Sequence, residues 1–198
     1  MYGITLAPTH KHIPKWGNLK RYLDRNSFKI TYGNLYKQYD IDKFCEGIKE
    51  KKIDIITADG GFDFSVDYND QEHLYHRICF GELVCHFQIQ SIGGCFICKF
   101  FDIYSVFTIQ VLYMLYCHYD EVHIYKPLSS RPANSEKYIV CKGFRGIDKD
   151  FLKKLQYILK NWNNYVFNFK MPNIFIQQLS DFNNEFTSNQ IKYIKDTI

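Results

Sequence analysis

The chain has 198 residues, 46% of them hydrophobic and 23% charged, and a formal net charge of +4. These values are ordinary for a globular chain and indicate one domain with a sizeable core, which excludes a disordered or fibrous protein. The charge allows a polyanionic partner without requiring one. Seven cysteines without regular spacing exclude the disulfide framework of a small secreted protein and favour a reducing, intracellular setting.

Neither a membrane span nor a metal site is predicted. The most apolar segment, 106–117, is too short to cross a bilayer and contains Gln110, so we expect a buried helix. The C-x-x-C pair at 95–98 lies inside a strand-like run, and no second Cys/His pair is placed to complete a site. The H-x-H pair at 10–12 lies in a proline-containing loop, where histidines are usually solvated.

Hydrophobic periodicity predicts strands that alternate with helices. The expected elements are strand 2–6, a loop with one helical turn at 7–25, strand 27–32, helix 40–52, strand 53–58, helix 70–90, strand 95–99, helix 105–118, strands 121–125 and 135–141, and helix 149–161. This order predicts an α/β fold with a mostly parallel sheet and helices on both faces. The last two strands are joined by the loop 126–134 without a helix, so one of them is expected to run antiparallel.

The end of the chain is weakly patterned. Residues 161–198 are rich in Asn, and one further helix is expected near 174–183. We therefore expect one domain over 1–160, followed by a helical or irregular extension over 161–198.

Three ionisable residues fall at predicted strand ends. Asp59 follows strand 53–58, Lys99 closes an apolar run, and Glu136 precedes the last strand. Ligands of open α/β sheets bind at such ends. An acid–lysine–acid cluster suits proton transfer, because desolvation favours neutral lysine while carboxylates favour the charged form. On spacing alone, a solvated turn acid and a surface lysine are equally compatible with the pattern.

Two polar segments could bind a ligand. The loop 126–131 supplies two cations and two hydroxyls around Pro127, a donor set that suits phosphates, and Arg131 could bind one with two hydrogen bonds. A polar surface loop is the alternative. Residues 69–72, N-D-Q-E, could simply cap the helix that follows them.

Four motifs, in order and with matched spacing, carry a resemblance to a known family. They are Y-G-I-T-L at 2–6, A-D-G-G-F at 58–62, G-G-C-F-I-C-K-F-F-D at 93–102 and K-P-L-S-S-R-P-A-N-S-E-K-Y-I-V-C-K-G-F at 126–144. The chain resembles the cap-specific mRNA 2′-O-ribose methyltransferases, eukaryotic or from large DNA viruses, within the FtsJ-like, Rossmann-type methyltransferases. The resemblance covers roughly residues 2–160.

The resemblance implies a Lys-Asp-Lys-Glu tetrad that transfers a methyl group from S-adenosylmethionine to a ribose 2′-hydroxyl near the capped 5′ end. Asp59, Lys99 and Glu136 match its second, third and fourth members. In the family the lysine helps to deprotonate and position the 2′-oxygen, and the carboxylates hold the lysine. The family needs no metal.

The resemblance also implies binding residues and a location. Asn34, Leu35 and Asp59 match cofactor contacts, although the family often has an acid at the position of Asn34. The matching RNA contacts near the cap are Asn69, Asp70, Gln71, Ser130, Arg131 and Asn134. The implied partner is the capped 5′ end of mRNA, in the nucleus or, for a viral relative, in the cytoplasm.

The chain departs from the family at its start. The family's first lysine, its glycine-rich cofactor loop and its central first strand lie upstream of Y-G-I-T-L, which here follows Met1 directly. That strand normally lies between those at Ile4 and Ile53, so two inner edges would lack a partner. The chain could be a fragment of a longer enzyme, an inactive relative that binds RNA or a partner, or an enzyme completed by a second chain. A 2′-O-methyltransferase for another RNA is a further alternative.

Overall fold

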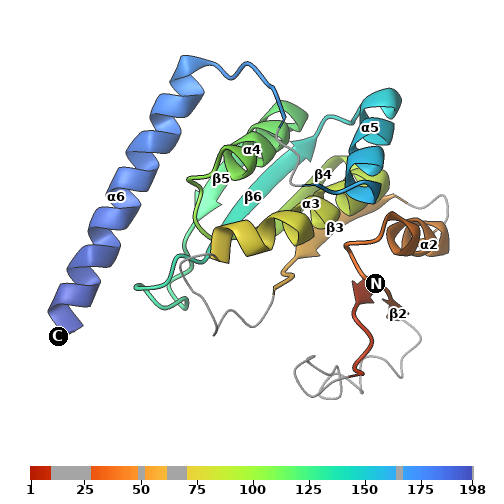
Figure 1. Ribbon diagram of the computed structural model, residues 1–198, viewed down its shortest axis with the longest axis horizontal. Coiled ribbons are helices and arrows are strands. Elements are labelled where there is room, and N and C mark those ends of the chain that lie inside the picture. The colour runs from red at the N-terminus through yellow and green to blue at the C-terminus, as the bar shows by residue number, and fades with distance from the viewer. Residues whose placement is uncertain (10–27, 49–51, 62–70, 164–166, 198) are drawn as a thin grey trace.

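The computed structural model describes residues 1–9, 28–48, 52–61, 71–163 and 167–197, and its strands and helices follow the predicted order (Figure 1). The elements are β1 (Tyr2–Thr5), β2 (Lys29–Tyr32), α2 (Gln38–Ile48), β3 (Ile53–Ala58), α3 (Gln71–Ile89), β4 (Gln90–Phe100), α4 (Val106–His118), β5 (Tyr119–Tyr125), β6 (Lys137–Phe144), α5 (Lys149–Lys160) and α6 (Asn173–Thr197). The loop expected at 7–25 lies mostly outside the described residues.

The strands form two sheets. Strands β1 and β2 pair in parallel, and a four-stranded sheet has the order β3-β4-β6-β5. Strands β3 and β4 are parallel, whereas β6 runs antiparallel to both β4 and β5. The expectation of a mostly parallel sheet with one antiparallel strand near the C-terminal end is therefore confirmed.

The two sheets are not joined by hydrogen bonds between strands. Strand β3 pairs only with β4, and β1 only with β2, among the described residues. The expectation that a further strand belongs between Ile4 and Ile53 stays a prediction.

Helices α2 to α5 form one layer, because α3 contacts each of the other three (Figure 1). The face of β4 beneath this layer carries the buried side chains of Phe96, Cys98 and Phe100. On the opposite face, Ile55 of β3, the neighbour of Cys95 in the ladder, is 67% exposed. We expected helices on both faces of the sheet. The described residues place α2 to α5 on one face only.

Two expected boundaries were wrong. The strand expected at 95–99 begins earlier, because α3 passes directly into β4 at Gln90 and the strand includes Gly93 and Gly94. The glycines lie inside β4, where Gly93 has a φ of +75° and the β3–β4 register shifts, so they form a bulge. The helix expected at 174–183 is also longer, since α6 has 25 residues.

Candidate active site

One edge of the four-stranded sheet collects the predicted chemical groups. Strands β3 and β4 both point their carboxyl ends at it, and Asp59 and Lys99 lie there. Because β6 is antiparallel to β4, its first residue reaches the same edge, and Glu136 directly precedes it. Such an edge is where open α/β sheets bind ligands.

Lys99 and Asp59 form an ion pair at this edge. Lys99 Nζ lies 2.6 Å from Asp59 Oδ1, and it also donates to the backbone oxygen of Asp59 at 3.3 Å. The lysine side chain is only 12% exposed and the aspartate 67%, so solvent reaches the pair mainly from the carboxylate. Gly61 lies alongside, where an added Cβ would be 3.3 Å from Lys99 Nζ. A residue without a side chain therefore keeps space open beside the amine.

Glu136 is the third predicted residue at this edge, next to the start of β6. Tyr138 is opposite Lys99 in the β4–β6 ladder, and side-chain alternation places residue 136 on the same face as residue 138. Partial burial, and then the charges of Asp59 and Glu136, raise the pKa of Tyr138. Among the described residues no ion pair joins Glu136 to Lys99, and Ser130 Oγ donates to Glu136 Oε1 at 3.4 Å.

Helix α3 holds the backbone at both Lys99 and Asp59, through two residues that sequence analysis missed. Glu82 Oε1 accepts from the Gly60 N–H at 2.7 Å, and Glu82 Oε2 lies 2.8 Å from Tyr75 Oη. The Tyr75 hydroxyl is also 2.6 Å from the carbonyl oxygen of Lys99. Burial raises the pKa of Glu82 to about 7. Its signal in the sequence was a single acid inside the apolar run C-F-G-E-L-V-C at 79–85.

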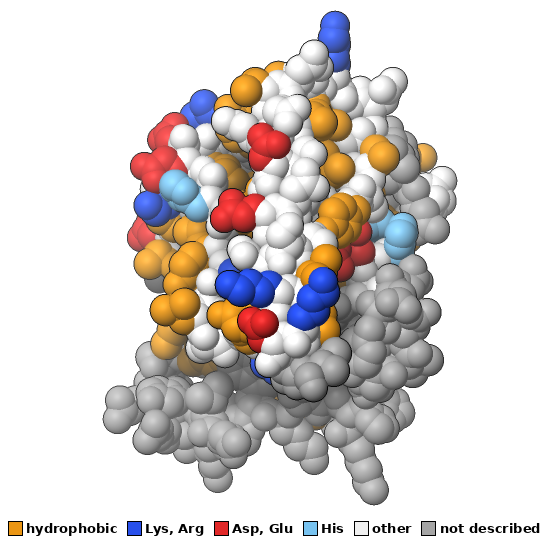
Figure 2. Space-filling view, turned by 90° about the vertical axis from the view of Figure 1, so that its left-hand side faces the viewer, with side chains coloured by type: hydrophobic (Ala, Val, Ile, Leu, Met, Phe, Trp, Pro, Cys, Tyr) orange, Lys and Arg blue, Asp and Glu red, His pale blue; other side chains and the backbone are white. Residues whose placement is uncertain are grey.

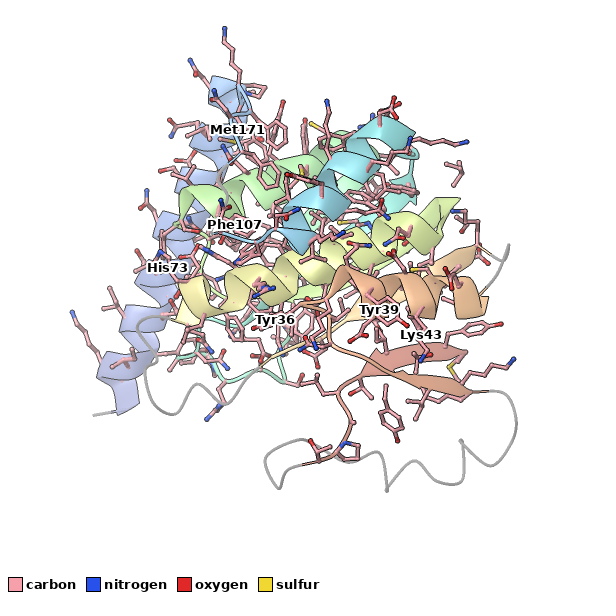
Figure 3. All side chains as sticks on the ribbon, turned by 45° about the vertical axis from the view of Figure 1, so that its right-hand side comes forward. Tyr36, Tyr39, Lys43, His73, Phe107 and Met171 are labelled. Atoms are coloured by element: carbon pink, nitrogen blue, oxygen red, sulfur yellow. The ribbon has the colours of Figure 1, made fainter. Side chains whose placement is uncertain are left out.

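The turn after β2, which carries the predicted cofactor residues, is held by the same helix. The Tyr36 N–H donates to Asn34 Oδ1 at 2.9 Å, which closes the turn. Arg77 of α3 donates to the Tyr36 carbonyl at 3.2 Å, and its Cζ lies 4.8 Å from the Tyr36 ring centroid. Tyr36 is labelled beside α3 in Figure 3. The backbone of Leu35 packs so closely on Gly81 that an added Cβ there would lie 2.2 Å from the Leu35 oxygen.

The loop between β5 and β6 is organised by Lys126. Its Nζ donates to the backbone oxygens of Asn134, at 2.9 Å, and Glu136, at 2.7 Å, and to the side-chain oxygen of Asn134. Burial lowers the pKa of Lys126. Of the two cations predicted to bind phosphate, Lys126 is therefore turned inward to hold the loop, whereas Arg131 is exposed.

Lys137, which sequence analysis also missed, links the end of β4 to the start of β6. Its side chain is 1% exposed, and Nζ donates to the carbonyl oxygens of Phe101 at 2.6 Å and Ser135 at 2.8 Å. Burial lowers its pKa to about 8, and the Asp102 carboxylate, 3.9 Å away, acts in the opposite direction. Its signal was a lysine directly before the apolar run Y-I-V-C.

The remaining predicted RNA contacts are only partly described. Gln71 begins α3, with its Oε1 3.4 Å from Ser135 Oγ, near the start of β6. Asn69 and Asp70, like the histidines at 10 and 12, lie outside the described residues. Within the described ranges no group of three or more His, Cys, Asp or Glu could hold a metal ion, and no helix is long and apolar enough to cross a membrane.

Comparison with known proteins identifies the family. The sequence profile described as FtsJ-like methyltransferase matches residues 1–144. The chain belongs to the FtsJ-like methyltransferase family. FtsJ-like methyltransferases depend on S-adenosylmethionine.

Individual relatives of this FtsJ-like chain carry more specific names. It is 39% identical over 129 residues to cap-specific mRNA (nucleoside-2′-O-)-methyltransferase 1A of Caenorhabditis briggsae, which covers 63% of this chain and 15% of the relative. The chain is also 39% identical to human cap-specific mRNA (nucleoside-2′-O-)-methyltransferase 1, over 61% of this chain and 15% of the relative. The enzyme of the same name from Trypanosoma brucei brucei is 35% identical to the chain, over 63% of this chain and 34% of the relative. The chain thus spans between about one seventh and one third of these relatives.

A solved structure shows the same fold. A Plasmodium falciparum protein described as a ribosomal RNA methyltransferase superposes with a TM-score of 0.52 at 22% identity, over 74% of this chain and 86% of that one. This similarity supports the FtsJ-like fold and carries no information about substrate.

Proposed function

We propose that this FtsJ-like chain carries a centre that transfers a methyl group from S-adenosylmethionine to the ribose 2′-hydroxyl of a nucleotide next to the mRNA cap. The observation that carries the proposal is the Lys99–Asp59 ion pair at the sheet edge, with Glu136 on the same face. The names of the relatives from three organisms support the capped substrate.

The geometry suits activation of an alcohol. An alcohol is a poor nucleophile until its proton is removed, and Lys99 Nζ, in its neutral amine form, is the group placed to hold the 2′-oxygen and take up that proton. Asp59 orients the amine through the 2.6 Å contact. The bound cofactor supplies an electrophilic methyl group on its sulfonium sulfur. The O–C bond forms as the S–C bond breaks, and in-line placement accounts for much of the acceleration.

The turns at the ends of β2 and β3 are the proposed cofactor site, with Asn34, Leu35 and Asp59. The two turns could bind one ligand together, because α3 holds them both. Arg77 and Gly81 hold the turn after β2, and Glu82 holds the turn after β3. Asn34 would meet the cofactor with its amide nitrogen, since its oxygen accepts from Tyr36. This donor replaces the acid that the family often has there.

The RNA is assigned to the edge beside the β5–β6 loop. The proposed contacts are Asn69, Asp70, Gln71, Ser130, Arg131 and Asn134. The exposed Arg131 suits a phosphate, and Ser130 and Asn134 are held by Lys126 and one another in a fixed loop. Figure 2, which looks at the side of the molecule next to α6, shows cations and acids interspersed among the described side chains. That face therefore offers no single basic patch to compete for the RNA.

A binding protein without activity is the second candidate. It is favoured by one observation, that no lysine other than Lys99 forms an ion pair with Asp59 among the described residues. A third candidate is a 2′-O-methyltransferase for another RNA. For an active protein, the open edges of β1 and β3 are where a further strand, from this polypeptide or a second chain, would complete the sheet.

Labelled methyl transfer separates these candidates. The protein is incubated with labelled S-adenosylmethionine and with capped or uncapped RNA of one sequence, and cofactor binding is measured by calorimetry. We expect transfer to capped RNA only, and a loss of about 100-fold or more in Lys99→Ala with cofactor binding retained. Lys142→Ala, which removes an exposed lysine paired with Glu121 on the same sheet, is the matched control.

Each contrary result has a meaning. Normal transfer by Lys99→Ala would refute the assigned role of the lysine. Equal transfer to uncapped RNA would favour a different RNA substrate. RNA binding without any transfer would favour the inactive relative.

A further inference from the structure

Glu82 is a buried acid that contacts the backbone next to the proposed centre without contacting the side chains of Lys99 and Asp59 in any hydrogen bond described above. Its side chain is 5% exposed, and it lies on the buried side of α3 next to β4. Buried carboxyl groups are normally paired with a cation or with several donors. Among the described residues, the groups that hydrogen-bond to Glu82 are a backbone N–H, of Gly60, and one hydroxyl, of Tyr75.

The Tyr75 hydroxyl cannot satisfy all its neighbours with its own hydrogen. It lies between two oxygens, the Lys99 carbonyl at 2.6 Å and Glu82 Oε2 at 2.8 Å. A hydroxyl has one hydrogen to donate, and a carbonyl oxygen can only accept. If the Tyr75 hydrogen goes to Lys99, the short contact with Glu82 needs a second hydrogen, which only a protonated carboxyl group can supply.

We propose that Glu82 acts as a neutral carboxylic acid that positions the Lys99–Asp59 pair. Its carbonyl oxygen accepts from Gly60, its hydroxyl donates to Tyr75, and Tyr75 donates to the Lys99 carbonyl. Gly60 follows Asp59 directly, so this chain of three hydrogen bonds ties together the two backbone segments that carry the ion pair. Glu82 is a positioning residue, and its role in activity rests on the function proposed above.

The surroundings of Glu82 agree with the neutral form. Burial is the largest influence and raises its pKa to about 7; the hydrogen bond from the Gly60 N–H and the charge of Lys99 act against it, and the charge of Asp59 adds to it. The titratable groups that face Glu82 are Tyr75, Cys79 and Cys85 on α3, Cys98 and Lys99 on β4, and Asp59 after β3. Gly60 is part of the arrangement, since a Cβ added there would lie 2.5 Å from Glu82 Oε1.

A second buried acid on α3 provides the contrast. Glu72 is 8% exposed, and one of its oxygens accepts from the N–H groups of Tyr104, at 3.0 Å, and Ser105, at 2.8 Å. These contacts need no hydrogen from the carboxyl group. Glu72→Gln is therefore the matched control for Glu82→Gln.

The first test needs neither substrate nor activity. Infrared difference spectra between the wild type and Glu82→Gln should show the carbonyl band of a protonated carboxyl group at pH 6, and this band should disappear above pH 8. Exchange of the Gly60 amide hydrogen should be slow in the wild type and in Glu82→Gln, and at least about tenfold faster in Glu82→Leu, which removes the acceptor. An ionised carboxylate at pH 6, or a Gly60 amide unchanged in Glu82→Leu, would overturn the proposal.

The second test uses methyl transfer. The amide of Glu82→Gln reproduces the neutral acid, so it should keep kcat/KM within about threefold at pH 6.5, whereas Glu82→Leu and Tyr75→Phe should lose at least about tenfold. The ratio of wild type to Glu82→Gln should fall as pH rises through about 7, and the ratio to Glu72→Gln should stay constant. A pH-independent ratio for Glu82→Gln would contradict the positioning role. No transfer by any variant, with the infrared band and Gly60 protection present, would refute the proposed function while the neutral acid and its backbone link stand.

Discussion

The two sides of Lys99 are built differently. On one side, Asp59 contacts the amine at 2.6 Å, Glu82 holds the turn after Asp59, and Tyr75 holds the backbone carbonyl of Lys99. On the other side, Glu136 makes no ion pair with the lysine among the described residues and depends on a loop held by Lys126. The difference shows that the Asp59 side holds the lysine directly, and it leads us to propose that the Glu136 side meets the substrate.

The largest expected effect comes from removing the charge of each carboxylate in turn and comparing the losses in kcat/KM. Asp59→Asn removes the charge that contacts Lys99, and we expect kcat/KM for capped RNA to fall about 100-fold. Glu136→Gln removes a charge that acts over a longer distance, worth about 1.4 kcal/mol, so we expect about a tenfold loss. Steady-state kinetics of both variants measure the comparison. Equal losses would show that Glu136 joins the lysine as closely as Asp59 does.

The second effect concerns the fastening of the Asp59 side. The pKa of Glu82 is raised from about 4.5 to about 7, so the folded state holds this proton more tightly than the unfolded state. Its stabilising contribution is fully present below pH 4.5 and is lost as pH rises through 7, by about 3 kcal/mol in the free energy of unfolding. Denaturant titrations of the wild type and Glu82→Gln at several pH values measure it.

The difference between the two proteins is the relevant quantity. Burial lowers the pKa of His86 to about 3, so that group contributes with the opposite sign, and stability from it rises with pH. Because His86 is present in both proteins, its contribution cancels. A difference between wild type and Glu82→Gln that does not change with pH would contradict a neutral Glu82.

The smallest expected effect concerns the loop on the Glu136 side. The ring of Phe186, on α6, has Lys137 Nζ at 4.3 Å and Lys126 Nζ at 5.8 Å from its centroid. Phe186→Leu keeps an apolar side chain but removes the aromatic face, so we expect a loss of about 1 kcal/mol in the free energy of unfolding.

The same substitution tests whether α6 supports the loop. We expect KM for capped RNA to rise about fivefold, since a cation–π contact of this size is worth about 1 kcal/mol. Ile194→Ala, at a 44% exposed position on the same helix, is the control and should leave KM unchanged. An unchanged KM in Phe186→Leu would show that α6 is not needed to hold the loop.

The sequence could predict that Asp59 and Lys99 lie at one edge of the sheet, because the signals for their positions are local. Asp59 and Lys99 each end an apolar strand, and the glycines at 60 and 61 mark the turn between strand and site. The confirmed order of strands and helices follows from the same local alternation. The resemblance then supplied a chemical role that spacing alone left open.

The parts that the sequence did not reveal depend on distant contacts. Glu82 meets a backbone N–H 22 residues away, and Lys137 meets a carbonyl 36 residues away. The inward turn of Lys126 depends on the carbonyls of its own loop. The sequence underpredicted the length of α6, whose last part makes contacts with distant residues, such as Thr187 with the Tyr104 hydroxyl at 2.6 Å and Gln190 with the Ala133 carbonyl at 3.4 Å.

We propose that Lys99 and Asp59 form the centre at which a ribose 2′-oxygen next to the cap is methylated. The most direct test compares capped RNA that has ribose, or 2′-deoxyribose, in the nucleotides next to the cap, with labelled S-adenosylmethionine as donor. We expect label on the ribose substrate. The rate of labelling should fall at least about 100-fold with the 2′-deoxy substrate, and equally with Lys99→Ala on the ribose substrate. Label retained on the 2′-deoxy substrate, or undiminished in Lys99→Ala, would contradict it.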